Sequence, residues 1–143
     1  MKTTNSTKET IELAQKFAKK IDAGDILLLE GELGSGKTTF VKGVCEYFGI
    51  NESEVRSPTF TLMNTYTTLK HQDQAEQIVH IDTYRMDEPQ ELIDIGMEEH
   101  LDDKNSIVLV EWPEKIKNLV KKRNIKKIKF KHLENNRRKI KTT

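Results

Sequence analysis

One segment of the chain combines residue types and a spacing that suit phosphate chemistry. Residues 31–38 read Gly-Glu-Leu-Gly-Ser-Gly-Lys-Thr and match the pattern G-x-x-x-x-G-K-[ST] at every position. The glycines let the backbone curl so that successive N–H groups point at phosphate oxygens, and a helix beginning near Lys37 adds its positive dipole end. Lys37 supplies a cation for the β- and γ-phosphates, and the Thr38 hydroxyl can ligate Mg²⁺. The segment therefore predicts a P-loop that binds ATP with Mg²⁺.

Two acidic residues stand where strands beside such a loop would end. Asp82 follows the apolar run 78–81, and Glu111 follows the apolar run 107–110. In P-loop proteins an acidic residue at the end of a neighbouring strand holds or orients the magnesium shell. We expect Glu111 near the metal and Asp82 near the γ-phosphate or the attacking water, although the sequence alone leaves the division of roles open.

Apolar periodicity and turn signals place these residues on alternating strands and helices. Helices are expected at residues 6–22, 37–48, 89–95 and 113–120. Strands are expected at residues 26–29, 59–68, 78–81 and 107–110, followed by a β-hairpin at 125–133 and 137–142. The pattern predicts an α/β fold in one domain spanning residues 1–143. It is a P-loop NTPase-like three-layer fold with a central, mostly parallel sheet and a C-terminal β-hairpin.

The net charge of +1 hides a strong asymmetry along the chain. Residues 1–114 carry 11 Lys and Arg against 22 Asp and Glu, whereas residues 115–143 carry 13 against one. A solvated face is the simplest interpretation of the basic segment, and contact with RNA or with an acidic protein patch is the alternative.

Other features of the sequence concern the cellular location of the protein and residues with weaker functional signals. No stretch approaches the roughly 18–20 apolar residues of a membrane span, and residues 1–7 lack the apolar core of a secretory signal. Cys45 is the single cysteine, so we expect a small buried side chain in a cytoplasmic protein. His80 should share a strand face with Asp82, in a packing or orienting role. Trp112 is expected in the core or beside the nucleotide.

Beyond the P-loop, the sequence contains several longer blocks with a defined order. They are the P-loop extended by Thr39-Phe40, then Ser57-Pro58-Thr59-Phe60-Thr61-Leu62, His80-Ile81-Asp82-Thr83-Tyr84-Arg85, Glu91-Leu92 with Gly96, and Val110-Glu111-Trp112-Pro113. Together these blocks closely resemble the bacterial TsaE (YjeE) family, over nearly the whole chain from about Ser6 to the closing hairpin.

This resemblance implies a role in tRNA modification. Members of the family are the ATPase component of the machinery that makes threonylcarbamoyladenosine on the adenosine 3′ of the anticodon, in tRNAs that read ANN codons. The resemblance implies docking on the TsaD and TsaB proteins, with ATP hydrolysis resetting that pair between cycles, and a functional link to the synthase TsaC.

The resemblance also implies roles for particular residues. Thr38 and Glu111 correspond to the Mg²⁺ ligands, and Asp82 and Lys37 to residues needed for hydrolysis. The implied nucleotide contacts are Thr7 on the adenine side, Leu33, Gly34, Ser35, Gly36, Lys37, Thr38, Thr39 and Arg137. Where the family often has a Gly-Arg pair, this chain has Asn136-Arg137.

Three mechanisms fit these patterns. No arginine finger or dedicated base follows the P-loop in the sequence, so we expect a slow ATPase that a partner stimulates. A nucleotide-switched binding module without essential hydrolysis is the second interpretation. A small-molecule kinase is the third, although little chain is left for a lid and a substrate-binding insert. A GTPase is excluded because the chain has no Asn-Lys-x-Asp guanine reader.

Overall fold

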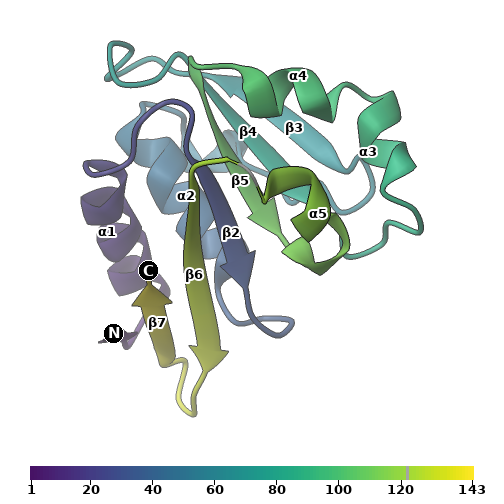
Figure 1. Cartoon of the computed structure of the whole chain (residues 1–143). Coiled ribbons are helices and arrows are strands. Elements are labelled where there is room, and N and C mark those ends of the chain that lie inside the picture. Colours follow the sequence, from purple (N-terminus) through teal and green to yellow (C-terminus); the bar gives the residue numbers. More distant parts are fainter. Residues whose placement is uncertain (122) are drawn as a thin grey trace.

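The computed structural model describes residues 1–121 and 123–143. A seven-stranded sheet runs through its centre in the order β1-β7-β6-β2-β5-β4-β3 (Figure 1). The strands are β1 (Lys2–Thr4), β2 (Ile26–Glu30), β3 (Met63–Thr67), β4 (Gln77–Asp82), β5 (Ser106–Glu111), β6 (Ile125–His132) and β7 (Arg138–Thr142). Strands β6, β2, β5 and β4 are parallel, whereas β7 and β3 run antiparallel to them and β1 runs antiparallel to β7.

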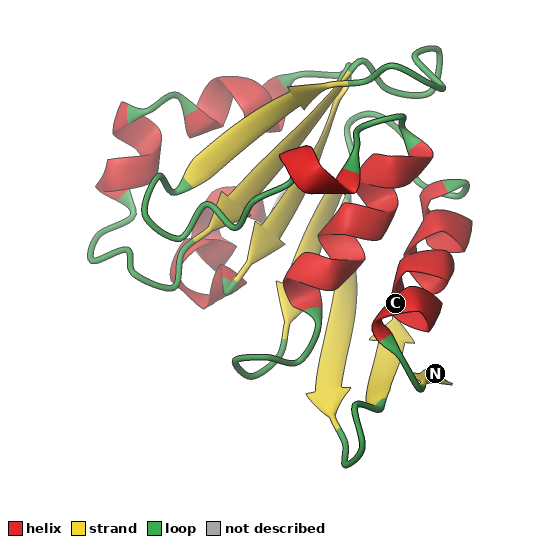
Figure 2. Cartoon of the chain, turned by 180° about the vertical axis from the view of Figure 1, so that it is seen from behind, coloured by secondary structure: helices red, strands yellow, loops and turns green. Residues whose placement is uncertain are grey.

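Helices lie on both sides of the sheet (Figures 1 and 2). On one side lie α1 (Thr7–Ala18) and α2 (Lys37–Tyr47); on the other lie α3 (Gln90–Asp94), α4 (Met97–Asp102) and α5 (Lys117–Val120). Short 3₁₀ turns at Glu52–Glu54 and Pro113–Ile116 complete the described elements. Helix α1 begins at a Ser6 cap whose hydroxyl accepts from the Glu9 amide, as the capping box predicts.

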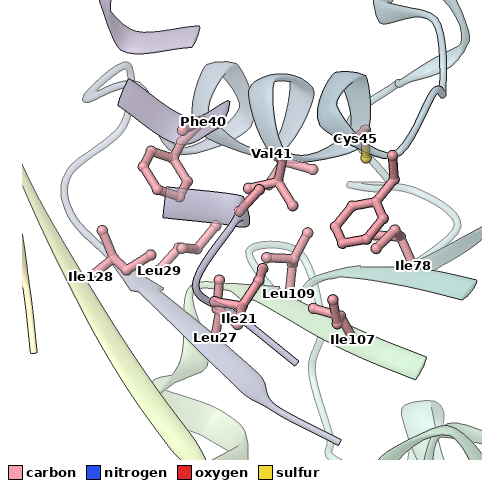
Figure 3. Close-up of a cluster of buried hydrophobic side chains, with 14 of the residues drawn as sticks. Ile21, Leu27, Leu29, Phe40, Val41, Cys45, Ile78, Ile107, Leu109 and Ile128 are labelled. Carbon is pink, nitrogen blue, oxygen red and sulfur yellow. The ribbon is translucent and has the colours of Figure 1, made fainter. Parts of the chain in front are cut away.

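The apolar run in β2 is continuous because both of its faces are buried. Leu27 and Leu29 pack with Phe40 and Val41 of α2 (Figure 3). Ile26 and Leu28 pack on the opposite face, in the cluster that also holds residues of α3, α4 and α5. Strand β2 is thus fixed from both sides, which gives the loop that follows it a rigid base.

The predicted fold class is confirmed, and so are the central strands and the C-terminal hairpin. The strand expected at 59–68 was wrong in extent, because β3 begins only at Met63. The Leu62 amide donates to the Pro58 carbonyl at 2.7 Å, and Leu62 has φ 67°, so residues 58–62 form a turn instead. The first helix ends at Ala18 rather than near Asp22, because the next amides bond three residues back and tighten the chain.

Strand β1, helix α4 and the 3₁₀ turn at Glu52–Glu54 were not predicted from the sequence. Strand β1 has only three residues, too few for a recognisable alternation. Helix α4 follows α3 after Gly96, whose φ of 92° caps the new helix in a left-handed conformation. In the described part of the chain, no helix is long and apolar enough to cross a membrane. Cys45 is buried as expected, and burial raises its thiol pKa to about 12.

Helices α1 and α2 approach each other closely at Gly43, which leads to a stability prediction. A Cβ at this position would lie 2.5 Å from Ala14 Cβ and 2.6 Å from the Ile11 carbonyl oxygen. Although alanine favours helices, Gly43→Ala should therefore lower the free energy of unfolding by about 1–3 kcal/mol, because the packed helices must separate. Urea denaturation followed by circular dichroism measures this. Glu46→Ala, at an exposed position of the same helix, is the control; a Gly43→Ala midpoint at or above wild type would contradict the packing.

Candidate functional site

The P-loop connects β2 to α2 and has the backbone that a phosphate cradle requires. Gly34 and Gly36 have φ angles of 76° and 104°, a region that residues with a Cβ avoid. Gly36 is the cap residue of α2, so the first amides of the helix open toward the loop. Gly31 is needed for another reason, because a Cβ there would come within 2.8 Å of the Phe130 carbonyl oxygen on β6.

Lys37 lies across this loop. Its ammonium donates to the carbonyl oxygens of Gly31 at 2.6 Å and of Glu32 at 2.9 Å, and it stands 3.9 Å from the ring centre of Trp112. Burial lowers the pKa of Lys37, and the nearby negative charges, Glu111 foremost, oppose that shift. The Lys37 ammonium is therefore held over the phosphate-binding loop by two carbonyl oxygens. Phosphate oxygens, which are more negative than carbonyl oxygens, could replace these contacts.

Thr38, Glu111 and His80 form a chain of hydrogen bonds behind the loop. The Thr38 hydroxyl donates to both carboxylate oxygens of Glu111, at 2.8 and 3.1 Å. The Nε2 atom of His80, which is fully buried, lies 2.6 Å from Oε2 of the same carboxylate. Because an ionised carboxylate can only accept, His80 must carry its proton on Nε2 when Glu111 is charged. His80 thus has the orienting role expected for it, and its partner is Glu111.

Parallel strand pairing brings the two acidic residues together. Asp82 ends β4 and Glu111 ends β5, and the register places them directly opposite each other. Strand β5 also pairs with β2, which leads into the P-loop. The carboxyl ends of three neighbouring strands therefore meet at one edge, where open α/β sheets bind their ligands.

Asp82 has different partners from Glu111. Its Oδ2 accepts from the hydroxyls of Ser57 and Thr59, at 3.1 and 3.2 Å, and its Oδ1 accepts from the Tyr84 amide at 2.9 Å. Asp82 therefore ties the 57–59 segment to the end of β4. Glu111 contacts the loop threonine, whereas Asp82 contacts a surface segment.

A pocket of about 280 Å³ opens at this edge. Its lining consists of Leu33, Gly34, Ser35, Gly36, Lys37, Thr38, Thr39, Ser57, Thr59, Asp82, Tyr84, Glu111, Trp112 and Arg138. It includes the predicted P-loop residues and both acidic candidates. Thr7 is exposed at the start of α1 and Arg137 is exposed in the hairpin turn, and neither lines this pocket.

Arg138, the neighbour of the predicted nucleotide contact Arg137, lines this pocket. Its side chain lies over Gly36, where an added Cβ would come within 2.7 Å of Arg138 Nε. Alternation along β7 could have indicated this, because Ile140 faces the core and a residue two positions earlier shares that face. Ser57, Thr59 and Tyr84 also line the pocket, although no role was predicted for them; all three belong to the blocks that carry the resemblance.

The backbone after Glu111 is unusual. Trp112 has φ 59° and ψ 57°, a left-handed conformation that is uncommon for a bulky residue. The Thr83 hydroxyl donates to the Trp112 carbonyl, and the Tyr84 ring lies 4.9 Å from the Trp112 ring. These contacts hold the indole against Lys37 at the pocket wall.

The residues present fit a magnesium–nucleotide ligand. Magnesium usually keeps several waters and takes one or two protein oxygens together with phosphates, and Thr38 and Glu111 offer that donor set. The Ser35 hydroxyl oxygen and Arg138 Nε are buried and have no hydrogen-bond partner among the described residues. Buried polar groups are normally paired, so these two atoms are available for a polar ligand.

The chain is similar over most of its length to known proteins of one family. A family model described as "Threonylcarbamoyl adenosine biosynthesis protein TsaE" matches residues 4–140. A protein of Rickettsia prowazekii named "tRNA threonylcarbamoyladenosine biosynthesis protein TsaE" is 39% identical over 96% of this chain and 90% of its own length. A protein of the same name from Bacillus subtilis is 42% identical over 74% of this chain and 60% of its own. The crystal structure of YdiB from B. subtilis superposes with a TM-score of 0.72 at 31% identity, covering 97% of this chain and 80% of that one.

The orienting contact of His80 generates a prediction. His80→Phe keeps a ring but removes the donor to Glu111, so the Mg²⁺-dependent part of nucleotide affinity should fall roughly 10–100-fold, as happens when a group that orients a metal ligand is lost. Calorimetric titration of ADP with and without Mg²⁺ measures it. His80→Gln, whose amide can reach the Nε2 position, should recover most of the loss. Equal losses in both variants would mean that His80 only fills space.

Proposed function

The chain belongs to the TsaE family, and from this we propose that it binds and hydrolyses Mg-ATP within the machinery that makes threonylcarbamoyladenosine in tRNA. The observation that carries the proposal is the partly buried contact of Thr38 with Glu111 beneath a complete phosphate-binding loop. In this proposal the chain works in the cytoplasm, docks on TsaD and TsaB, and is functionally linked to the synthase TsaC.

The proposed reaction gives separate roles to four pocket side chains and to the amides of the loop. Thr38 and Glu111 would hold Mg²⁺, which supplies charge stabilisation to the phosphates when bound. Lys37 exchanges its two carbonyl contacts for phosphate oxygens. The free amides of the loop and of the α2 N-terminus bind the phosphates without side-chain rearrangement. Arg138, with an unpartnered Nε beside Gly36, is a further candidate for the nucleotide, in place of Arg137.

We propose that hydrolysis is slow until a partner binds. Asp82, the candidate for positioning the attacking water, already accepts three hydrogen bonds from the 57–59 segment and the Tyr84 amide. Of the arginines in the described residues, Arg138 alone lines the pocket, and it lies beside the loop glycine. A partner that moves the 57–59 segment would free Asp82, and it could also supply a missing charge in trans.

A specific observation favours a second candidate, the nucleotide-switched binding module. The segment attached to Asp82 continues into Phe60, which is 83% exposed and has the Arg85 guanidinium 4.6 Å from its ring centre. An exposed aromatic residue of this kind is suited to a protein interface. Nucleotide binding at Asp82 could thus alter a docking surface with no need for hydrolysis.

The P-loop lysine gives the first test. Lys37→Ala should weaken ATP binding roughly 10–100-fold, because a charged hydrogen-bond donor to phosphate is lost, and should abolish hydrolysis. Fluorescent-nucleotide displacement measures the affinity. Lys42→Ala removes the same charge from the same helix outside the pocket and should bind ATP like wild type. Full ATPase activity in Lys37→Ala would remove the loop from the mechanism.

The gating proposal has its own test. Phosphate release by the chain should rise roughly tenfold or more when purified TsaD and TsaB are added, as groups supplied in trans can do. A flat rate across the titration would rule out gating. Replacing ATP by a non-hydrolysable analogue then separates the two candidates: repeated rounds of tRNA modification with the analogue would favour the switch over the ATPase.

A further inference from the structure

The basic segment forms one continuous surface on the outer side of the closing hairpin. Along β6 and β7 the apolar residues Ile128, Phe130 and Ile140 face the core beneath α1 and α2. Successive strand residues point to opposite faces, so the intervening residues point away from that core. Five of them are exposed lysines, which we call the lysine face: Lys127, Lys129, Lys131, Lys139 and Lys141.

The strand register concentrates these charges. Lys129 stands opposite Lys141, and Lys131 stands opposite Lys139. Directly opposed residues have their Cβ atoms about 5 Å apart, and like charges at that distance repel. Two such lysine pairs therefore lower the stability of the hairpin when no anion is bound to this surface. The arrangement is therefore better suited to a bound polyanion than to solvent alone.

Neighbouring groups leave the lysine face free. No ion pair among the described residues involves any of its lysines. The acidic register partner of Lys129 is Glu30 on β2, and Glu30 lies 3.5 Å from Lys117. In Figure 1 no helix lies in front of β6 and β7, whereas α5 lies beside them over the neighbouring strands. Among the described residues of β6, Ile125, the first of the strand, packs against the apolar cluster on that side.

The chemistry of the lysine face favours nucleic acid over protein. Protein interfaces have apolar centres and are poor in lysine. The exposed large hydrophobic side chains of the described residues, such as Phe60 and Tyr84, all lie outside this hairpin. Lysine ammonium groups bind backbone phosphates as point charges and read no sequence.

We propose that the lysine face binds the phosphate backbone of RNA. Lys131 and Lys139 lie at the same end of the hairpin as Arg138, which lines the nucleotide pocket, but their side chains point to the opposite face of the sheet. A bound RNA would therefore lie on the outer face of β6 and β7. The choice of tRNA as the RNA rests on the proposed function, whereas the contact itself rests on the lysines.

The test compares two variants with equal charge. One replaces four residues of the lysine face by glutamine: Lys129, Lys131, Lys139 and Lys141. The control replaces four exposed lysines elsewhere by glutamine: Lys8, Lys16, Lys20 and Lys104. Binding of a fluorescently labelled tRNA transcript, without nucleotide or partner proteins, is followed by anisotropy over a series of salt concentrations. Circular dichroism and ATP binding establish that both variants fold.

The proposal makes a quantitative prediction. The wild type should show a log–log salt slope of about −3 to −4, since each phosphate contact contributes roughly −0.7 to −0.9. The lysine-face variant should lose most of that slope and at least tenfold in affinity, while the control stays within about twofold of wild type. Equal losses in the two variants would show a net-charge effect and overturn the proposal.

Two further outcomes separate this inference from other readings. Poly-glutamate and unlabelled tRNA are compared as competitors of the labelled tRNA at equal concentrations of negative charge. If poly-glutamate displaces the labelled tRNA as well as unlabelled tRNA does, the surface binds an acidic protein and the RNA proposal is overturned. Because the assay contains no nucleotide, a failure here leaves the ATPase proposal intact, and an inactive ATPase leaves a positive RNA result intact.

Discussion

The contact between the Thr38 hydroxyl and the Glu111 carboxylate is the interaction on which the rest of the site depends. It joins the first turn of α2 to the end of β5, so the phosphate loop and the acidic edge of the sheet have one fixed geometry. That contact is possible because β2 and β5 are paired in parallel and buried on both faces. His80 supports it from β4, where it occupies a fully buried position. The apolar core thus positions a small polar cluster that solvent could not hold in place.

The sequence predicted the parts of this site that follow from local rules. The P-loop has a fixed spacing, and the two acidic residues follow apolar runs, so their places at the strand ends could be inferred without a structure. The partners of Asp82 could not be inferred, because Thr59 lies in a turn that sequence patterns suggested was a strand, and Ser57 directly precedes that turn. The hydrogen bonds of Ser57 and Thr59 to Asp82 are long-range, and local patterns do not predict them. Arg138 and Arg137 are adjacent in sequence, and the alternation that points Ile140 to the core also points Arg138 toward Gly36.

The carboxylates of Glu111 and Asp82 have distinct surroundings. This difference bears on the division of roles between them, which the sequence left open. Glu111 is held by a hydroxyl and an imidazole next to the phosphate loop, a suitable environment for a metal ligand. Asp82 is linked to an exposed segment that carries Phe60. Chemistry at the phosphate end of the pocket can therefore be coupled to the outer surface through Asp82. The lysine face is a separate region, on the outer face of β6 and β7, whereas Phe60 precedes β3 at the other end of the strand order.

Reconstitution of tRNA threonylcarbamoylation from purified components tests this account most directly. The chain, or its Glu111→Gln variant, is combined with TsaC, TsaD, TsaB, ATP and Mg²⁺, and modified nucleoside is counted over several turnovers. The account predicts continued product formation with the wild type, and arrest after about one turnover with a folded Glu111→Gln variant, because the metal ligand is lost. Equal product with the wild type, with the variant and without the chain would contradict it.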